Sequence, residues 1–178
     1  MNKSIVLGGG CFWCLEAVFD KLNGVIKAQS GYAGGHVKNP GYKEVCYGGT
    51  GHAEVLKIDY NPELISLETL LQVFFTFHNP TTLNRQGNDV GTQYRSIIFY
   101  ENDEEKTLIE KYISEIASSF WDNPIVTEVS PSKIFYQAEA NHDNYYELNS
   151  AQPYCKFVIE PKVSKLRTQY QKLLKSNL

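Results

Sequence analysis

The sequence has almost no methionine: the initiator Met1 is the only one among 178 residues. It also lacks long apolar runs. The N-terminal stretch MNKSIVLGGGCFW has one lysine and a run of only three apolar residues, too short for the core of a signal peptide. No later segment is long enough to span a bilayer. We therefore expect a cytoplasmic protein that does not contact a membrane.

An excess of charge of one sign is also absent. The chain has 17 Lys and Arg against 20 Asp and Glu, which gives a net charge of −3 and a pI of about 5.8. This composition gives no electrostatic reason to expect nucleic acid as a partner. Hydrophobic residues make up 42% of the chain, which argues against wholesale disorder. We expect one domain over residues 1–178, and a monomer.

Four cysteines are present: Cys11, Cys14, Cys46 and Cys155. In a reducing cytosol such thiols are less often a structural disulfide set than catalytic, metal-binding or simply buried groups. Cys11 and Cys14 form a C-x-x-C pair, but the other cysteines and the four histidines do not repeat a zinc-ligand spacing. We therefore expect no metal and no other cofactor.

Hydrophobic periodicity predicts strands and helices in the order β-α-β-β-α-β over the first hundred residues. The elements are a strand at 4–7, a helix at 12–22, strands at 25–32 and 53–60, a helix capped by Ser66, and a strand at 96–100. This order predicts an α+β fold, a two-layer sandwich on a split βαβ (ferredoxin-like) core with helices on one face of the sheet.

The segments between and after these elements are predicted as extra loops and C-terminal helices. The loops are 33–52 and 79–95, an extended stretch lies near 125–137, and the last helices lie near 139–149 and 162–175. A further helix follows Asn102, which has capping-box spacing with Glu105. Its inward residues are expected to be Leu108, Ile109, Tyr112, Ile113, Ile116 and Phe120.

Cys11 follows three glycines at the end of the first strand and opens the first helix. Free N–H groups at a helix N-terminus stabilise a thiolate, and a lowered thiol pKa is what a nucleophilic cysteine needs. Taken alone, the residues leave three alternatives: a buried small hydrophobe, a phosphate nest made by the glycines, or a redox dithiol with Cys14. The phosphate nest is the weakest, because G-x-G-x-x-G spacing and a Walker lysine are both missing.

The string GCFWCLE at residues 10–16 resembles the signature of the A-type peptide methionine sulfoxide reductases. Further matching segments follow in order: SGYAGG (30–35), Gly41-Tyr42, EVCYGGTGHAEV (44–55), YNPELIS (60–66), HNPTTLNRQGNDVGTQYRSIIFY (78–100) and QAEANHDNYY (137–146). The resemblance implies an α+β enzyme that reduces the S epimer of methionine sulfoxide, free or in oxidised proteins. It also implies a repair function and regeneration by thioredoxin.

The resemblance also assigns roles to individual residues. It places the nucleophile on Cys11 and the acid on Glu54. The two sulfoxide-binding tyrosines fall on Tyr42 and Tyr94, and the water-holding aspartate falls on Asp89.

Phe12 and Trp13 fall on the aromatic walls that bury the methyl group of the substrate. The chemistry fits these residue types, because the sulfur of a sulfoxide is a poor electrophile until its oxygen is protonated or strongly hydrogen-bonded. Glu54 would have to be protonated near neutral pH, which requires burial. Attack by Cys11 on sulfur would then release methionine and leave a sulfenic acid.

A second cysteine must resolve that sulfenic acid, and the residues leave two candidates. Pro153-Tyr154-Cys155 resembles the C-terminal resolving position of many relatives, but KFVIEPKVSKLR follows it in place of a glycine-rich tail. Cys14 is always near Cys11, whereas Cys155 would need a mobile segment to fold over the site. We favour Cys14, with Cys155 as the alternative. Cys46 and Glu16 are expected to be structural.

Two functions of other classes are also compatible with the cysteines. A general thioredoxin-like disulfide oxidoreductase using Cys11-x-x-Cys14 would reduce insulin disulfides and ignore methionine sulfoxide. A zinc-stabilised binding module would hold about one metal ion per chain and lose its fold with a chelator.

Overall fold

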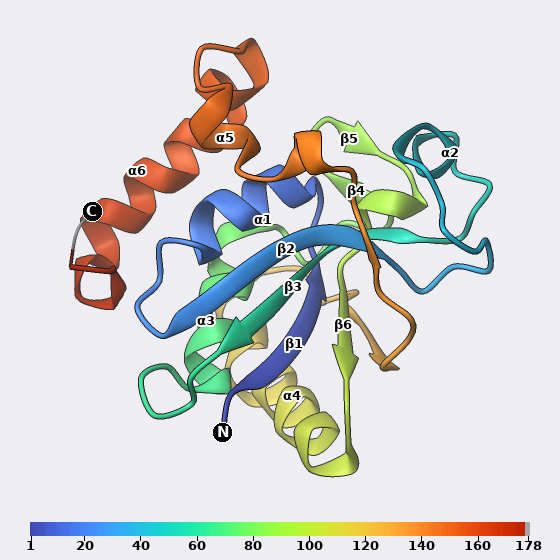
Figure 1. The fold of residues 1–178 in the computed structure, drawn as a ribbon. Coiled ribbons are helices and arrows are strands. Elements are labelled where there is room, and N and C mark those ends of the chain that lie inside the picture. Colours follow the sequence, from blue (N-terminus) through green and yellow to red (C-terminus); the bar gives the residue numbers. More distant parts are fainter. Residues whose placement is uncertain (177–178) are drawn as a thin grey trace.

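The computed structural model describes residues 1–176, and its centre is a six-stranded mixed sheet in the order β7-β6-β1-β3-β2-β8 (Figure 1). The four central strands are β1 (Lys3–Gly8), β2 (Val25–Ala33), β3 (Ala53–Tyr60) and β6 (Ile97–Tyr100). Neighbours among these four are antiparallel. The strand order β6-β1-β3-β2 confirms the split βαβ core, because each helical crossover spans one intervening strand.

Three helices cover one face of this sheet: α1 (Phe12–Phe19), α3 (Leu67–Phe77) and α4 (Asp103–Glu115). The register pairs Ile5 with Ile58 and Leu7 with both Leu56 and Ile98, so alternate side chains point toward the helices. These side chains form the main core with the apolar faces of the three helices. The core therefore fixes α1, and with it the position of Cys11.

The opposite face of the sheet is covered by extended chain. Strand β7 (Glu128–Pro131) pairs parallel with β6 at one edge, and β8 (Tyr136–Gln137) pairs with β2 at the other. Between them Phe135 packs over a smaller apolar cluster that includes Val55 and Phe99. The single extended stretch expected near 125–137 is thus two short strands at opposite edges.

The predicted caps of α3 and α4 are confirmed. The Ser66 hydroxyl accepts a hydrogen bond from the Thr69 N–H at 3.1 Å, and the Asn102 side chain accepts one from the Glu105 N–H at 2.9 Å. The inward assignment of Ile116 and Phe120 is wrong, since these two residues are 42% and 58% exposed. The helix ends at Glu115, and the following 3₁₀ turn (Ala117–Phe120) changes the face that the chain presents.

The segments predicted as loops contain short elements of their own. Residues 33–52 include helix α2 (Tyr42–Cys46), and residues 79–95 include the hairpin of β4 (Arg85–Gln86) and β5 (Asp89–Val90) and a 3₁₀ turn (Thr92–Tyr94). Elements this short contain too few residues for a hydrophobic period to develop.

The C-terminal helices are also more broken than predicted. The helix expected at 139–149 is a 3₁₀ turn (Ala140–His142) followed by α5 (Tyr145–Leu148), because Asn144 is left-handed with φ 51°. A π-helical turn (Cys155–Ile159) leads into α6 (Glu160–Gln169), and a 3₁₀ turn (Gln171–Leu173) follows.

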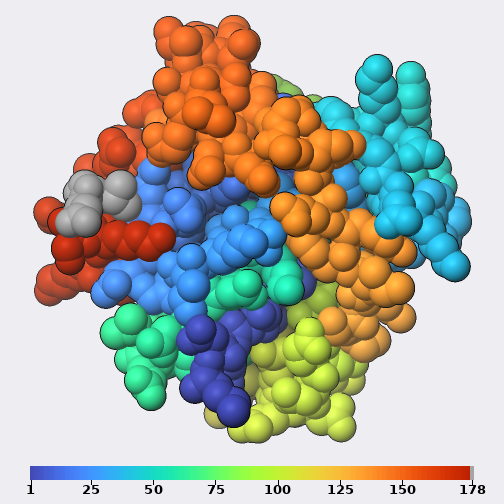
Figure 2. Space-filling view, viewed as in Figure 1, coloured from blue at the N-terminus to red at the C-terminus, as the bar shows by residue number. Residues whose placement is uncertain are grey.

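The C-terminal elements pack against α1, at the opposite end of the sequence. Figure 2 shows the orange segment that includes α5 lying directly on the blue N-terminal part. This packing brings residues 139–162 over the loop that carries Cys11. Within residues 1–176, no helix is long and apolar enough to cross a bilayer.

Candidate active site

Cys11 lies at the N-terminus of α1, where the chain leaves β1 through three glycines. Gly10 has φ +94°, and a Cβ atom there would lie 2.5 Å from Cγ of Gln86 in β4. Glycine therefore provides both the left-handed turn and the close approach of the hairpin. The turn leaves the Cys11 residue only 7% exposed, in the lining of a cavity.

We predict that Gly10→Ala destabilises the protein by about 1–3 kcal/mol through left-handed strain and overlap with Gln86. Chemical denaturation would measure the change. Gly49→Ala is the matched control, because a Cβ atom at Gly49 meets nothing within 4 Å. Equal stability of the two variants would contradict this account of the turn.

Glu54 is a buried carboxyl group on β3, with 1% of the residue exposed. Its Oε2 accepts a hydrogen bond from the Phe12 backbone N–H at 3.1 Å, which links β3 to the first turn of α1. Burial raises the pKa of Glu54 to about 8, and the charges of Asp89 and Cys14 add to the shift. Glu54 is therefore mainly protonated at neutral pH and can donate a proton beside Cys11.

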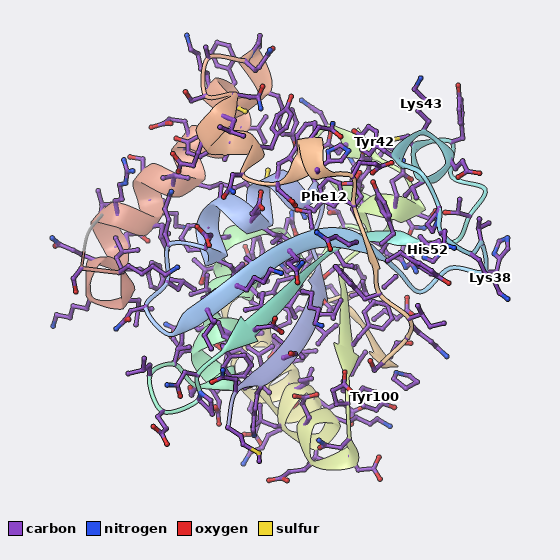
Figure 3. All side chains as sticks on the ribbon, viewed as in Figure 1. Phe12, Lys38, Tyr42, Lys43, His52 and Tyr100 are labelled. Atoms are coloured by element: carbon purple, nitrogen blue, oxygen red, sulfur yellow. The ribbon has the colours of Figure 1, made fainter. Side chains whose placement is uncertain are left out.

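Tyr42 begins α2, Tyr94 ends the 3₁₀ turn after β5, and both side chains are half-buried. Burial raises the pKa of each phenol, and the charge of Glu54 raises it further. Both hydroxyls thus keep their protons and can donate hydrogen bonds. Figure 3 shows Tyr42 close to Phe12, and their ring centroids are 6.4 Å apart.

Trp13 provides an aromatic surface next to Tyr42. Its indole stacks on Tyr145, with centroids 3.7 Å apart and planes within 5°, and its Nε1–H donates to Nδ1 of His142 at 3.1 Å. Phe12 is fully buried beneath this surface. The two residues predicted as aromatic walls therefore differ in exposure: Trp13 is partly exposed, and Phe12 is fully buried against it.

Sequence reasoning missed Glu139, which connects three segments around the site. Its Oε1 accepts from the Tyr42 backbone N–H at 2.7 Å, and its Oε2 accepts from the Tyr32 hydroxyl at 2.8 Å. His142, also missed, is buried against Phe12 and Tyr42, and burial lowers its pKa. The only available signal was that both lie in the matching segment QAEANHDNYY.

The cysteine pair differs from the expectation of a low pKa at Cys11. Burial raises the pKa of the Cys11 thiol well above its usual value, and hydrogen bonding with Cys14 and the charges of Cys14 and Glu54 reinforce this. The effect of the helix N-terminus is outweighed. The hydrogen bond from Cys11 and the nearby charge of Lys162 lower the pKa of Cys14 to about 7. The pair therefore loses its first proton near neutral pH, and this titration belongs to the pair rather than to either cysteine alone.

The other two cysteines have different environments. Cys155 is fully buried in the π-helical turn and belongs to the same apolar cluster as Cys11 and Cys14, so in this form its segment already lies over the site. Cys46 has an exposed thiol, and its backbone carbonyl accepts from Nε2 of Gln93 at 3.2 Å. That bond ties the helix carrying Tyr42 to the turn that ends at Tyr94.

A cavity of about 300 Å³ opens onto the cysteine pair. Its lining residues are Gly9, Cys11, Cys14, Gln86, Gly87, Asn88, Asp89, Tyr154, Phe157, Val158 and Lys162. Asp89 Oδ2 accepts a hydrogen bond from the Tyr154 hydroxyl at 2.7 Å, and the charge of Asp89 also raises the pKa of Glu54. Sequence reasoning gave no role to Tyr154 or Lys162, which enter the site only because the C-terminal segment folds back.

Glu16 is buried rather than solvated, with 5% of the residue exposed. Its Oε1 accepts from the Asn144 backbone N–H at 3.1 Å and so holds the start of α5, which carries Tyr145. Burial raises the pKa of Glu16 to about 7. Over residues 1–176, no three His, Cys, Asp or Glu side chains gather as a metal ion would require.

Comparison with known proteins gives a consistent result. The family model described as peptide methionine sulfoxide reductase matches residues 3–174. The chain is 53% identical over 174 residues to the peptide methionine sulfoxide reductase MsrA of Acinetobacter baumannii, covering 98% of this chain and 99% of the relative. It is 52% identical over 171 residues to the MsrA of Trichodesmium erythraeum, covering 96% and 97%.

Solved structures agree. The reduced form of Mxr1 from Saccharomyces cerevisiae superposes with a TM-score of 0.79 at 39% identity, covering 86% of this chain and 89% of that one. Mxr1 in complex with Trx2 gives a TM-score of 0.56 at 30% identity, covering 81% and 84%. Because a family model and full-length relatives match nearly the whole chain, this protein belongs to the peptide methionine sulfoxide reductase family.

Proposed function

We propose that this protein is a peptide-methionine (S)-S-oxide reductase that repairs methionine in oxidised proteins or reduces the free amino acid. The observation that carries the proposal is the buried Glu54 carboxyl, which bonds the Phe12 N–H next to Cys11. The protonated Glu54 carboxyl can donate a proton to the sulfoxide oxygen while the adjacent Cys11 attacks the sulfur. The two protonated tyrosines beside them can donate hydrogen bonds to the same oxygen.

The proposed first step reduces the sulfoxide to methionine and oxidises Cys11 to a sulfenic acid. The Cys11 sulfur attacks the sulfoxide sulfur while Glu54 protonates the oxygen, and the hydroxyls of Tyr42 and Tyr94 donate hydrogen bonds to that oxygen. The S–O bond breaks and the oxygen leaves as water, so that the substrate sulfur is bonded to Cys11. A water molecule then attacks the Cys11 sulfur, the S–S bond breaks, methionine leaves, and Cys11 becomes a sulfenic acid. Trp13 holds the substrate methyl group, supported by Phe12.

The proposed second step regenerates the thiol. Cys14 attacks the sulfenic sulfur of Cys11, water leaves, and an intramolecular disulfide forms. A thioredoxin dithiol then reduces this disulfide, reaching it through the cavity whose rim includes the exposed Phe157. The structure of Mxr1 with Trx2 supports thioredoxin as this partner.

We further propose one catalytic domain acting as a monomer in the cytoplasm. The proposed cysteines and aromatic residues share one cluster, to which hydrogen bonds tie Glu54 and Asp89, so a single chain holds the whole proposed site. Catalysis by thiols needs a compartment that keeps cysteines reduced and supplies thioredoxin.

Turnover of the two separated methionine sulfoxide epimers with dithiothreitol tests the proposal. We expect turnover of the S epimer and none of the R epimer, because the substrate must present oxygen to Glu54 and its methyl group to Trp13 simultaneously. Insulin reduction run in parallel separates this activity from general disulfide exchange. Insulin reduction without activity on either epimer would contradict the proposed function.

A further inference from the structure

The hydroxyl group of Tyr154 lies between Cys14 and Asp89. It donates a hydrogen bond to Asp89 Oδ2 at 2.7 Å and lies 3.7 Å from Cys14 Sγ. A phenol has one proton and two lone pairs. With the proton directed at Asp89, the oxygen can accept the proton of the Cys14 thiol. The three groups thus form a continuous chain of thiol, phenol and carboxylate.

This chain is assembled by the tertiary fold. Cys14 is in the first turn of α1, Asp89 is in β5, and Tyr154 directly precedes the π-helical turn, so the contacts span 140 and 65 residues. The Tyr154 ring meets Trp13 edge-on, with centroids 6.0 Å apart and planes at 78°, which holds the ring in place. All three members of the chain line the cavity that also contains Cys11.

The charges around Cys14 favour loss of its proton. Lys162 comes from α6, donates from Nζ to the Phe77 carbonyl at 2.8 Å, and lowers the pKa of Cys14 by its charge, against the opposing effect of burial. The charge of Asp89 acts in the opposite direction. If Asp89 accepts the proton that Cys14 loses, its carboxylate becomes neutral. The negative charge that opposes formation of the Cys14 thiolate is then removed.

We propose that Tyr154 and Asp89 form a proton relay that activates Cys14 for attack on the sulfenic acid of Cys11. The inference rests on the proposed function and concerns only its second step. The Cys14 proton passes to the Tyr154 oxygen while the Tyr154 proton passes to Asp89. The S–S bond forms, the S–O bond of Cys11 breaks, and the proton on Asp89 leaves with the hydroxide as water. The reaction needs no further oxidant or reductant.

Single-turnover kinetics of Tyr154→Phe test the relay. Reduced protein is mixed with the S epimer, and both methionine release and the Cys11–Cys14 disulfide are followed in quenched samples. We expect methionine release at the unaltered rate and disulfide formation slowed about 10²-fold, the usual contribution of a positioned acid or base. Tyr100→Phe is the control, because Tyr100 lies at the far end of the sheet from Tyr42 and Phe12 (Figure 3).

Two further measurements distinguish a relay from simple packing. In Tyr154→Phe, disulfide formation should become steeper with pH, since hydroxide must replace the relay, whereas lost packing would leave the profile unchanged. In the unaltered protein, disulfide formation should be slower in deuterated water. A plot of its rate against the deuterium fraction of the solvent should be curved, because two protons move together. This second measurement needs no variant to fold.

The outcomes separate the relay from the function on which it rests. In one outcome, Tyr154→Phe releases methionine normally and then forms the disulfide at the same rate, and with the same pH profile, as the unaltered protein. That result would overturn the relay alone. An isotope effect of unity on disulfide formation would do the same. Absence of methionine release even in the unaltered protein would overturn the proposed function and the relay together.

Discussion

Glu54→Gln should lower the rate of sulfoxide reduction by about 10²–10⁴-fold, the range for loss of a general acid. The amide keeps the shape of the side chain and can still accept the Phe12 N–H bond, so the change removes the transferable proton and little else. Single-turnover methionine release measures the effect. Glu104→Gln, an exposed position on α4, is the control.

The stability of Glu54→Gln relative to the parent protein should increase as pH rises, because the parent loses stability. The pKa of Glu54 is raised from 4.5 to about 8 in the folded protein. Between these values the unfolded chain loses the proton and the folded protein keeps it, so the folded state loses relative stability with increasing pH. The stability advantage of Glu54→Gln should grow across this window by at most about 1.4 kcal/mol per pH unit.

Urea denaturation of the unaltered protein and Glu54→Gln at pH 5 and pH 8 measures this difference. If the difference in unfolding free energy between Glu54→Gln and the parent is the same at pH 5 and pH 8, Glu54 is not a buried, protonated carboxyl group. A variant that retains the parent rate would exclude Glu54 as the acid.

Cys14→Ser should slow disulfide formation by at least about 10²-fold while leaving the first methionine release intact. A thiol held in the adjacent helical turn acts at a very high effective concentration, which a serine hydroxyl does not provide in this reaction. A 1,3-diketone probe, which reacts with sulfenic acids and not with thiols, should therefore capture Cys11 after one turnover. Turnover with thioredoxin should fall in parallel with disulfide formation.

Cys155→Ser tests the alternative resolving cysteine. Cys155 is buried in the same apolar cluster as Cys14, so folding over the site does not distinguish the two. We expect Cys155→Ser to form the disulfide at the parent rate. The choice of Cys14 is wrong if Cys14→Ser forms a disulfide at the parent rate and Cys155→Ser does not.

The central fold was predictable because its strands and helices are long enough to show their periods. The paired apolar residues of β1 and β3, and the caps at Ser66 and Asn102, are local patterns that survive in the structure. The short elements were not predictable. Asn144 interrupts a good helical pattern with one left-handed residue, and α2 has only five residues.

The site divides in a similar way. Cys11, Glu54 and the two tyrosines lie in motifs that could be recognised in the linear sequence, and the structure gathers them. Tyr154 and Lys162 could not be found, because their contacts depend on how the C-terminal segment packs on α1. The pKa of Cys11 was misjudged for a related reason: position in sequence indicates a helix N-terminus, but burial depends on the assembled cluster.

The most direct test of the account is a single turnover without any external reductant. Fully reduced protein is mixed with excess S epimer, released methionine is counted, and the oxidised protein is digested for peptide mapping. The account predicts one methionine per chain and one peptide containing a Cys11–Cys14 disulfide, with Cys46 and Cys155 still free thiols. No methionine, or a chain oxidised without involvement of Cys11, would contradict it.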